Sequence, residues 1–315
     1  MKTVFMFPGQ GSQSIGMMSE LLSESELARN VFQEASDAIG KDLIDIAAQG
    51  PEALINQTEI TQPIVLAASV AMWEVWKQNT TFQPDYVCGH SLGEYTALVA
   101  SGVITLKEAV RLVHVRGQLM QNAVPQGEGG MAALLGLSDE LVTEACIEAS
   151  KGEVVAPANF NSPGQVVISG ATEALERAML LAKEKGAKRA AKLPVSVPCH
   201  CDLLKPAGEA LALEMNKIAF QPLQIPIMQN VNACLAEDIE SLKVNLLSHL
   251  YSPVLWSQSI ASLVNHGAGL FVECGPGKVL AGLNKRIDKN VKTLAMSDME
   301  TLQQVLAEFE ALSLS

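Results

Sequence analysis

Asp85-Tyr86-Val87-Cys88-Gly89-His90-Ser91-Leu92-Gly93-Glu94-Tyr95 places a serine between two glycines, after a short apolar run and before a helical pattern. This G-x-S-x-G pattern predicts a sharp strand-to-helix turn, because the glycines let the backbone bend without steric clashes. Such a turn lifts the Ser91 hydroxyl out of the sheet at a helix N-terminus, where backbone amides can bind an oxyanion. A chance turn is the alternative, and the flanking strand and helix argue against it. We therefore expect Ser91 to be a nucleophile.

The rest of the chain predicts an α/β fold with a largely parallel sheet, because short apolar runs bounded by Gly or Pro alternate with longer helical patterns. The predicted strands are residues 4–7, 86–88, 270–273 and 293–295. The predicted helices are residues 63–79, 91–101, 105–122, 202–217, 254–265 and 298–311, with a further helix from residue 278.

Residues 131–193 have a different order of elements. The pattern predicts strands at 131–137, 154–159, 165–169 and 188–193, with helices at 138–150 and 172–185. This β-α-β-β-α-β order is the ferredoxin-like arrangement. We expect a smaller ferredoxin-like subdomain at 126–197, inserted into a large α/β catalytic subdomain formed by 1–125 and 198–315. A cleft between the two would be the expected site.

Composition and charge exclude several classes of protein. The chain has 315 residues, 48% of them hydrophobic and 18% charged, which predicts a globular protein. A formal net charge of -12 argues against nucleic acid or an anionic membrane as a partner. Six cysteines without a C-x-x-C pair suit reduced thiols, and the N-terminal apolar run is too short for a signal peptide. We expect a cytoplasmic protein that acts as a monomer.

A serine nucleophile needs a base, and five histidines are candidates. His90 adjoins Ser91 but should point away from it, and His114 lies in a predicted helix as a core histidine. His200 follows a stiff, extended segment with prolines at 194 and 198, which could deliver an imidazole to a cleft. The residue pattern favours His200, and leaves His249 and His266 open.

Together, these residues resemble the malonyl-CoA:acyl carrier protein transacylases of fatty-acid synthesis, which share their fold with the acyltransferase domains of polyketide synthases. The resemblance covers essentially the whole chain and implies an α/β-hydrolase-like core. It rests on Phe7-Pro8-Gly9-Gln10-Gly11-Ser12-Gln13, Gly89-His90-Ser91-Leu92-Gly93-Glu94, Arg116, Asn161-Ser162-Pro163-Gly164-Gln165, Val197-Pro198-Cys199-His200 and Glu273-Cys274-Gly275-Pro276-Gly277.

The resemblance implies that the protein moves a malonyl group from malonyl-CoA, through an acyl-serine, to the phosphopantetheine thiol of acyl carrier protein. Ser91 would be the nucleophile and His200 its base, in a dyad steadied by the main-chain carbonyl of His249. The family usually has Gln at the last position, so His249 is a departure. Cys199 is a second departure, where bulkier or hydroxylated residues often influence the choice of acyl group.

Attack on a thioester also requires donors for the oxyanion. The amide of Leu92, directly after the nucleophile, is one natural donor. The resemblance makes Gln10 the second, in a loop that Gly9 and Gly11 allow to come close. It also makes Asn161 a substrate-binding residue.

Arg116 is the most informative charge. It shares a face of its predicted helix with Leu112, Val113, Leu119 and Met120, so its guanidinium needs an anion. A buried structural ion pair is one reading. By resemblance, Arg116 should instead hold the free carboxylate of the malonyl group.

Other motifs predict no cofactor and no metal. Gly9-Gln10-Gly11 lacks the third glycine of a dinucleotide fingerprint, because Ser14 stands there. Gly277-Lys278 lacks the upstream glycine and the Ser or Thr of a phosphate loop. Cys199 and Cys201 flank His200, but three successive residues cannot easily close a tetrahedral metal site.

Acyl carrier proteins are acidic, so docking requires a basic face on this acidic chain. Two basic groups are candidates, and a solvated helix face is the alternative for each. The insert group is Lys183, Lys185, Lys188, Arg189 and Lys192, and the C-terminal group is Lys278, Lys285, Arg286, Lys289 and Lys292.

Two rival functions share some of these features. A serine hydrolase such as a thioesterase also uses the G-x-S-x-G turn, but its usual order is Ser, Asp or Glu, His, and nothing obliges it to carry Arg116. A non-catalytic module that docks carrier proteins would not need Ser91, His200, Arg116 and Gln10 together.

Overall fold

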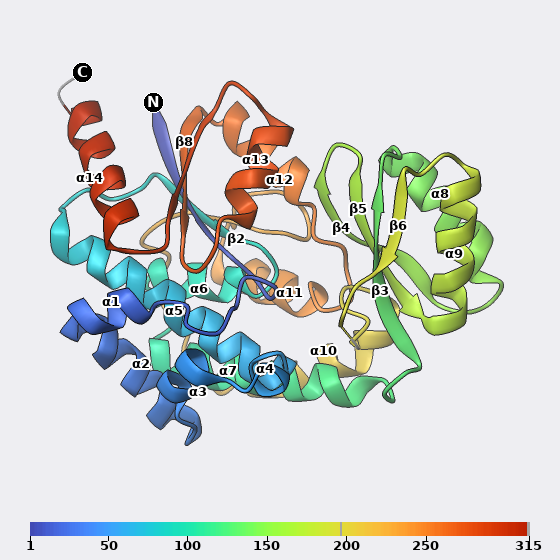
Figure 1. Ribbon diagram of the computed structural model, residues 1–315, viewed down its shortest axis with the longest axis horizontal. Coiled ribbons are helices and arrows are strands. Elements are labelled where there is room, and N and C mark those ends of the chain that lie inside the picture. The colour runs from blue at the N-terminus through green and yellow to red at the C-terminus, as the bar shows by residue number, and fades with distance from the viewer. Residues whose placement is uncertain (196, 314–315) are drawn as a thin grey trace. The chain divides into compact units, whose positions relative to one another are not determined.

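The computed structural model describes residues 1–195 and 197–313 (Figure 1). The chain forms two compact units. The first comprises Met1–Gly117, Ile218–Met228 and Leu263–Ser315, and the second comprises Gln118–Lys217 and Gln229–Ser262. The predicted insert at 126–197 lies within the second unit, which extends beyond it on both sides; as a domain boundary, 126–197 stays a prediction.

The first unit is built on a five-stranded sheet in the order β7-β2-β1-β8-β9. All neighbouring strands pair in parallel, which confirms the predicted parallel sheet. The strands are β1 (Lys2–Phe7), β2 (Tyr86–Gly89), β7 (Ile227–Met228), β8 (Ala268–Cys274) and β9 (Lys292–Met296). The two-residue β7, at the edge, was not predicted, because so short a strand has no readable period.

Helices surround this sheet in Figure 1. They are α1 (Ser19–Glu24), α2 (Glu26–Ile39), α3 (Leu43–Gln49), α4 (Glu52–Ile55), α5 (Thr58–Asn79), α6 (Gly93–Ala100), α7 (Leu106–Ala123), α13 (Val279–Ile287) and α14 (Met299–Ser313). The chain passes from the first unit into the second within α7. Helices α1 to α4 were not predicted. Helix α2 nevertheless has capping residues at both ends: the Ser25 hydroxyl accepts a hydrogen bond from the Ala28 amide, and Gly40 ends the helix in a left-handed conformation.

The core of the first unit forms around β1, the middle strand. Phe5 is fully buried and its ring packs against Trp73, Trp76 and Phe309 at centroid distances of 5.2–6.0 Å. These aromatic contacts join β1 to α5 and α14, so the ends of this discontinuous unit share one core.

Helix α5 begins five residues earlier than predicted, because Pro63 lies inside the helix and not at its start. A proline has no N–H, so the carbonyl of Glu59, four residues earlier, lacks its usual helical donor. Nδ1 of His114 lies 2.8 Å from that carbonyl oxygen and donates to it. His114 therefore repairs the backbone of α5, and has the structural role that the sequence favoured.

The second unit contains a four-stranded sheet in the order β4-β5-β3-β6 with antiparallel pairing. Its elements are β3 (Gly129–Leu135), α8 (Asp139–Ser150), β4 (Val155–Ser162), β5 (Gln165–Ala171), α9 (Thr172–Glu184) and β6 (Arg189–Lys192). The ferredoxin-like order predicted from the sequence is confirmed. The unit also contains η1 (Asp202–Leu204), α10 (Lys205–Met215), α11 (Ile239–Ser248) and most of α12 (Trp256–Asn265).

The two faces of this sheet are covered differently. Alternate residues of β3 point to opposite faces, as a strand requires. Ala132 and Leu134 join the core formed with α8 and α9, whereas Met131 packs with Leu193 and Cys199. Cys199, directly before His200, therefore lies on the sheet face opposite the helices.

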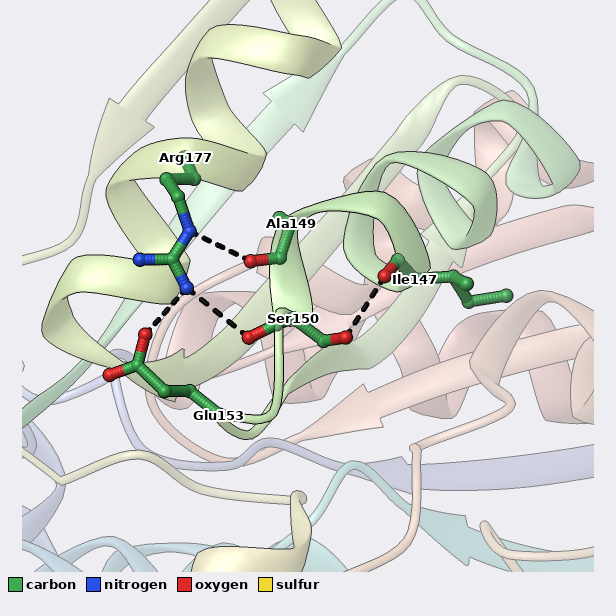
Figure 2. Close-up of polar contacts among 5 residues, drawn as sticks. All are labelled: Ile147, Ala149, Ser150, Glu153 and Arg177. Atoms are coloured by element: carbon green, nitrogen blue, oxygen red, sulfur yellow. Dashed lines mark hydrogen bonds and ion pairs between the residues drawn. The ribbon is translucent and has the colours of Figure 1, made fainter.

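A guanidinium closes the C-terminal end of α8 (Figure 2). Nε of Arg177, in α9, donates to the carbonyl of Ala149 at 2.8 Å, and Nη2 donates to the carbonyl of Ser150 at 3.2 Å and to Glu153 at 2.5 Å. The last carbonyls of a helix have no partner within the helix and carry its negative dipole end, so a cation stabilises them. Arg177 thus joins α9 to α8.

Among the described residues, no helix combines the length and the apolar character that a membrane crossing requires.

Candidate functional site

The candidate residues fall into two sets, one in each unit. Gln10, Ser91, Leu92 and Arg116 belong to the first unit, whereas Asn161, His200 and His249 belong to the second. Within the first unit, Arg116 lies beside Ser91 and the loop of Gln10 lies against the turn that carries Ser91. Within the second unit, His200 lies beside His249.

Ser91 occupies the turn between β2 and α6, with a φ of 52°, in the left-handed region that non-glycine residues seldom adopt. Backbone hydrogen bonds on both sides of the serine hold this conformation: the His90 amide donates to Phe7, and the Glu94 amide donates to the Ser91 carbonyl. The turn predicted from G-x-S-x-G is therefore present, with the strained serine typical of a nucleophile elbow.

Two glycines of the motif are required by close backbone contacts. A Cβ on Gly89 would lie 1.9 Å from the carbonyl carbon of Gly93, and a Cβ on Gly93 would lie 2.0 Å from the carbonyl oxygen of Phe7. Real Cβ atoms do not approach this closely. The start of α6 can therefore pack on β1 and β2 only because Gly89 and Gly93 have no side chains.

The loop after β1 approaches the same turn from the other side. A Cβ on Gly9 would lie 2.4 Å from the carbonyl oxygen of His90. The next residue, Gln10, has its side chain directed to Thr58, whose hydroxyl lies 3.3 Å from Nε2 of Gln10. The side chain is thereby engaged, which leaves the backbone amide of Gln10 as the group available for an oxyanion.

Arg116 is buried, with 1% of its surface exposed. Its Nη1 donates to Oε1 of Gln62 at 2.7 Å, and its Nη2 lies 3.5 Å from Oγ of Ser91. Within residues 1–195 and 197–313, Arg116 makes no ion pair and its buried Nε has no partner. The structural ion pair considered from the sequence is therefore not found in that part of the chain.

Burying a guanidinium without an anion costs free energy of folding, so this environment of Arg116 favours the binding of an anionic ligand. Nε and Nη2 form one edge of the planar fork, the geometry that binds a carboxylate through two hydrogen bonds. Cζ of Arg116 also lies 5.3 Å from the centre of the Tyr95 ring. Burial raises the pKa of Tyr95, so this phenol stays neutral and does not supply the missing charge.

Gly117 determines how closely α7 passes the start of α5. A Cβ on Gly117 would lie 2.5 Å from Cα of Glu59. This close crossing brings Arg116 within hydrogen-bond reach of Gln62, a fully buried polar residue on α5. Gln62 and Gly117 were missed in the sequence, although a glutamine beside a proline in an otherwise apolar helix was a readable signal.

In the second unit, His200 has a φ of 63° and is 3% exposed. Its amide donates to the carbonyl of Leu250 at 3.0 Å, and its Nδ1 lies 2.7 Å from the carbonyl oxygen of His249. A carbonyl only accepts hydrogen bonds, so Nδ1 carries the proton and Nε2 is the basic nitrogen of the neutral ring. His200 therefore has the tautomer that a general base requires.

The backbone around His200 is firmly packed. A Cβ on Gly129 would lie 2.7 Å from Cγ of Pro198, so the segment before His200 lies directly on the end of β3. His200 also lines a cavity of about 420 Å³ within this unit, together with Pro157, Tyr251 and Pro253 among others. His200 thus borders open volume although little of its surface is exposed.

The rings of His249 and His200 are stacked, with centroids 4.9 Å apart and planes inclined by 29°. His249 is 1% exposed, so its imidazole belongs to the interior beside His200. Asn161 is buried near the end of β4, and its predicted role in substrate binding stays a prediction.

The structure argues against His266 as the base. His266 is exposed and its ring contacts that of Tyr86 at 6.2 Å. Tyr86 is the first residue of β2, whereas Ser91 follows the last, so His266 lies at the wrong end of the strand.

Two buried cysteines near these residues, Cys88 and Cys201, are poor rival nucleophiles. Burial raises the pKa of the Cys88 thiol far above its usual range, and burial likewise raises the pKa of Cys201. A protonated thiol is a poor nucleophile and a poor metal ligand. Neither thiol is therefore a favoured alternative to the predicted nucleophile, Ser91.

Comparisons with known proteins agree with the geometry. A family model for the acyl transferase domain matches residues 4–305. The chain is 48% identical over 304 residues to the malonyl CoA-acyl carrier protein transacylase of Salmonella typhimurium, an alignment that covers 96% of this chain and 98% of the Salmonella protein.

Solved structures show the same likeness. An acyl carrier protein S-malonyltransferase from Vibrio cholerae superposes with a TM-score of 0.95 and 49% identity, covering 97% of this chain and 100% of that one. A malonyl-transacylase solved in complex with its type II PKS acyl-carrier protein superposes with a TM-score of 0.96 and 45% identity, covering 98% of this chain and 100% of that one.

Proposed function

Since the chain belongs to the family of malonyl-CoA:acyl carrier protein transacylases, we propose that Ser91 carries a malonyl ester between the two thiols of that reaction. The protein is an acyltransferase that moves malonyl groups from malonyl-CoA to acyl carrier protein and so supplies extender units for fatty-acid synthesis. The observation that carries the proposal is the buried, anion-free guanidinium of Arg116, 3.5 Å from the Ser91 hydroxyl.

In the first half-reaction, Oγ of Ser91 attacks the thioester carbonyl while Nε2 of His200 takes the hydroxyl proton. The carbonyl oxygen becomes an oxyanion that the amides of Leu92 and Gln10 stabilise, a contribution of about a hundredfold to a thousandfold in rate for each donor. The C–S bond then breaks, and the imidazolium returns the proton to the coenzyme A thiolate.

The second half-reaction is the reverse with another thiol. His200 takes the proton of the phosphopantetheine thiol, whose sulfur attacks the Ser91 ester through a second oxyanion. The C–O bond breaks and the imidazolium protonates Ser91. Throughout, the His249 carbonyl holds the Nδ1 proton of His200, which stabilises the imidazolium that forms in each half.

Arg116 would hold the free carboxylate of the malonyl group. In a malonyl ester that carboxylate is one methylene away from the reacting carbonyl carbon. A guanidinium beside Oγ of Ser91 is therefore at a suitable range, and an acetyl group would leave it buried without an anion. Asn161 contributes to substrate binding in this proposal.

Docking of the acidic carrier protein is assigned to the C-terminal group rather than to the insert group. In the insert group, Lys185 and Lys192 both pair with glutamates, 2.7 Å from Glu148 and 2.5 Å from Glu176. The C-terminal group also contains a pair, Lys292 with Glu308 at 2.5 Å. In the C-terminal group, Lys278 directly follows Gly277, where a Cβ would lie 3.8 Å from Ser12, in the loop of Gln10. This group therefore starts next to a predicted oxyanion donor. We further infer a cytoplasmic monomer that needs no cofactor.

The acyl-serine is tested by mass spectrometry after brief incubation with a mixture of malonyl-, methylmalonyl- and acetyl-CoA. We expect one malonyl group on the Ser91 peptide, no modification of Ser91→Ala, and normal loading of Ser23→Ala, an exposed control. Loading that survives Ser91→Ala would disprove the assignment. Rapid release of free malonate without acceptor would indicate a hydrolase instead.

Arg116→Ala should lower malonyl loading by about a hundredfold or more, because each hydrogen bond to a charged group is worth about 1.5–3 kcal/mol. Acetyl loading should survive or rise. The matched control is Arg111→Ala, an exposed arginine on the same helix, which should leave both rates unchanged. An equal loss of both acyl groups in Arg116→Ala would mean that Arg116 is structural.

His249→Gln should retain kcat/KM within a few-fold, with an unchanged pH profile, because the contact to Nδ1 of His200 comes from the backbone. His200→Ala should lose nearly all transfer. A shifted pH profile in His249→Gln would show that the stacked imidazole, and not only its carbonyl, tunes His200.

Lys285→Glu combined with Lys289→Glu should raise the KM for acyl carrier protein on the order of tenfold, since opposite charges at a docking face assist association. Loading from malonyl-CoA should not change. Lys183→Glu with Arg189→Glu is the matched pair in the insert group and should have no effect. The reverse result would assign docking to the insert group.

A further inference from the structure

The motif Glu273-Cys274-Gly275-Pro276-Gly277 has no role in the chemistry described so far. Its first two residues end β8, and Gly275-Pro276-Gly277 belong to the turn that leads to α13, in the same unit as Ser91. The turn lies next to the loop that carries Gln10, so its contacts bear on one of the two proposed oxyanion donors.

Gly275 makes the closest contact. Its φ is 136°, and a Cβ there would lie 3.0 Å from Cγ of Pro8 and 2.3 Å from Oγ of Ser69. Its amide donates to the carbonyl of Met296 at 3.1 Å, which fixes the residue to the end of β9. Gly275 therefore lies against Pro8, two residues before Gln10. Ser69 and the hydrogen bond to Met296 keep Gly275 in this position.

The loop is thus confined from two sides. On one side, Gly9 packs on the carbonyl of His90 in the turn that carries Ser91. On the other, the ring of Pro8 lies next to Gly275, and a Cβ on Gly277 would lie 3.8 Å from Ser12. A displacement of the turn would move Pro8, and with it the amide of Gln10.

Glu273 holds the turn in its shape. Its carboxylate is fully buried and accepts hydrogen bonds from the amides of Leu280 at 3.1 Å and Ala281 at 2.8 Å. These are amides of the first turn of α13, which have no acceptor within the helix. A carboxylate at this positive helix end joins α13 to the end of β8 and closes the turn between them.

We propose that Glu273 and Gly275 are positioning residues, which hold the loop after β1 so that the Gln10 amide points at the oxyanion. This role assumes the proposed function of Gln10, and neither residue touches the substrate. Since catalysis gains from donors that are fixed before the oxyanion forms, a small shift of the loop should cost rate without costing substrate affinity.

Gly275→Ala tests the proposal. A Cβ at residue 275 would press on Ser69 and Pro8, so the variant should displace the loop and lower kcat for malonyl loading by about tenfold to a hundredfold, part of the value of one oxyanion donor. The KM for malonyl-CoA should stay within a few-fold. Gly282→Ala is the matched control on α13, because a Cβ there meets no atom within 4 Å, and it should behave like the wild type.

A second readout separates positioning from general damage. Trifluoroacetonyl-CoA presents a ketone that a serine hydroxyl converts to a tetrahedral adduct, which fluorine NMR detects. Gly275→Ala should bind this analogue about tenfold to a hundredfold more weakly than the wild type does, while its Kd for coenzyme A stays unchanged. Glu273→Gln, which keeps the side-chain size but only one acceptor oxygen, should show the same changes to a smaller degree.

Wild-type kcat and analogue affinity in folded Gly275→Ala would overturn the proposal, as would an equal weakening of coenzyme A and analogue binding. If Gly275→Ala does not fold, Glu273→Gln decides by the same two criteria. If the wild type itself forms no Ser91 adduct, the proposed function fails and not merely the positioning role.

Discussion

Close backbone packing around the turn after β2 is the constraint on which the first unit depends. Three glycines make it possible, because a Cβ on Gly9, Gly89 or Gly93 would lie within 2.4 Å of a backbone atom. The contacts join β1, β2 and α6 in a single arrangement that fixes Ser91 in a left-handed conformation. The position of the Ser91 hydroxyl is thus set by backbone geometry and does not depend on flexible side chains.

The electrostatics of this unit follow from similar packing. Pro63 has no N–H for the Glu59 carbonyl, and Nδ1 of His114 donates a hydrogen bond to this carbonyl instead. Gly117 allows α7 to pass close to Glu59. These contacts hold α7 where Arg116 is buried beside Ser91. In the proposed function, this guanidinium receives its anion from the ligand. A neutral acyl group would leave the buried cation unpaired and would therefore be disfavoured.

The sequence was informative where chemistry restricts the choice of residue. The turn at Ser91 and the ferredoxin-like order of 131–193 could be read because glycine positions and strand periods leave few alternatives. Contacts between distant segments could not be read. Neither the pairing of Arg116 with Gln62 nor that of Gly275 with Pro8 has a local signal, since both depend on how helices and loops pack in three dimensions. The base was open among three histidines for the same reason.

Ser91 and His200 share one further property, although they belong to different units. Each is a non-glycine residue in the left-handed region, with φ of 52° and 63°, and each is fixed by backbone contacts of its own unit. Such conformations cost about 1–3 kcal/mol each and persist only where the surroundings determine them fully. Neither residue therefore needs the other to adopt its conformation. In the proposed mechanism, both residues therefore have their reactive conformation before substrate binds, so little reorganisation remains during the reaction.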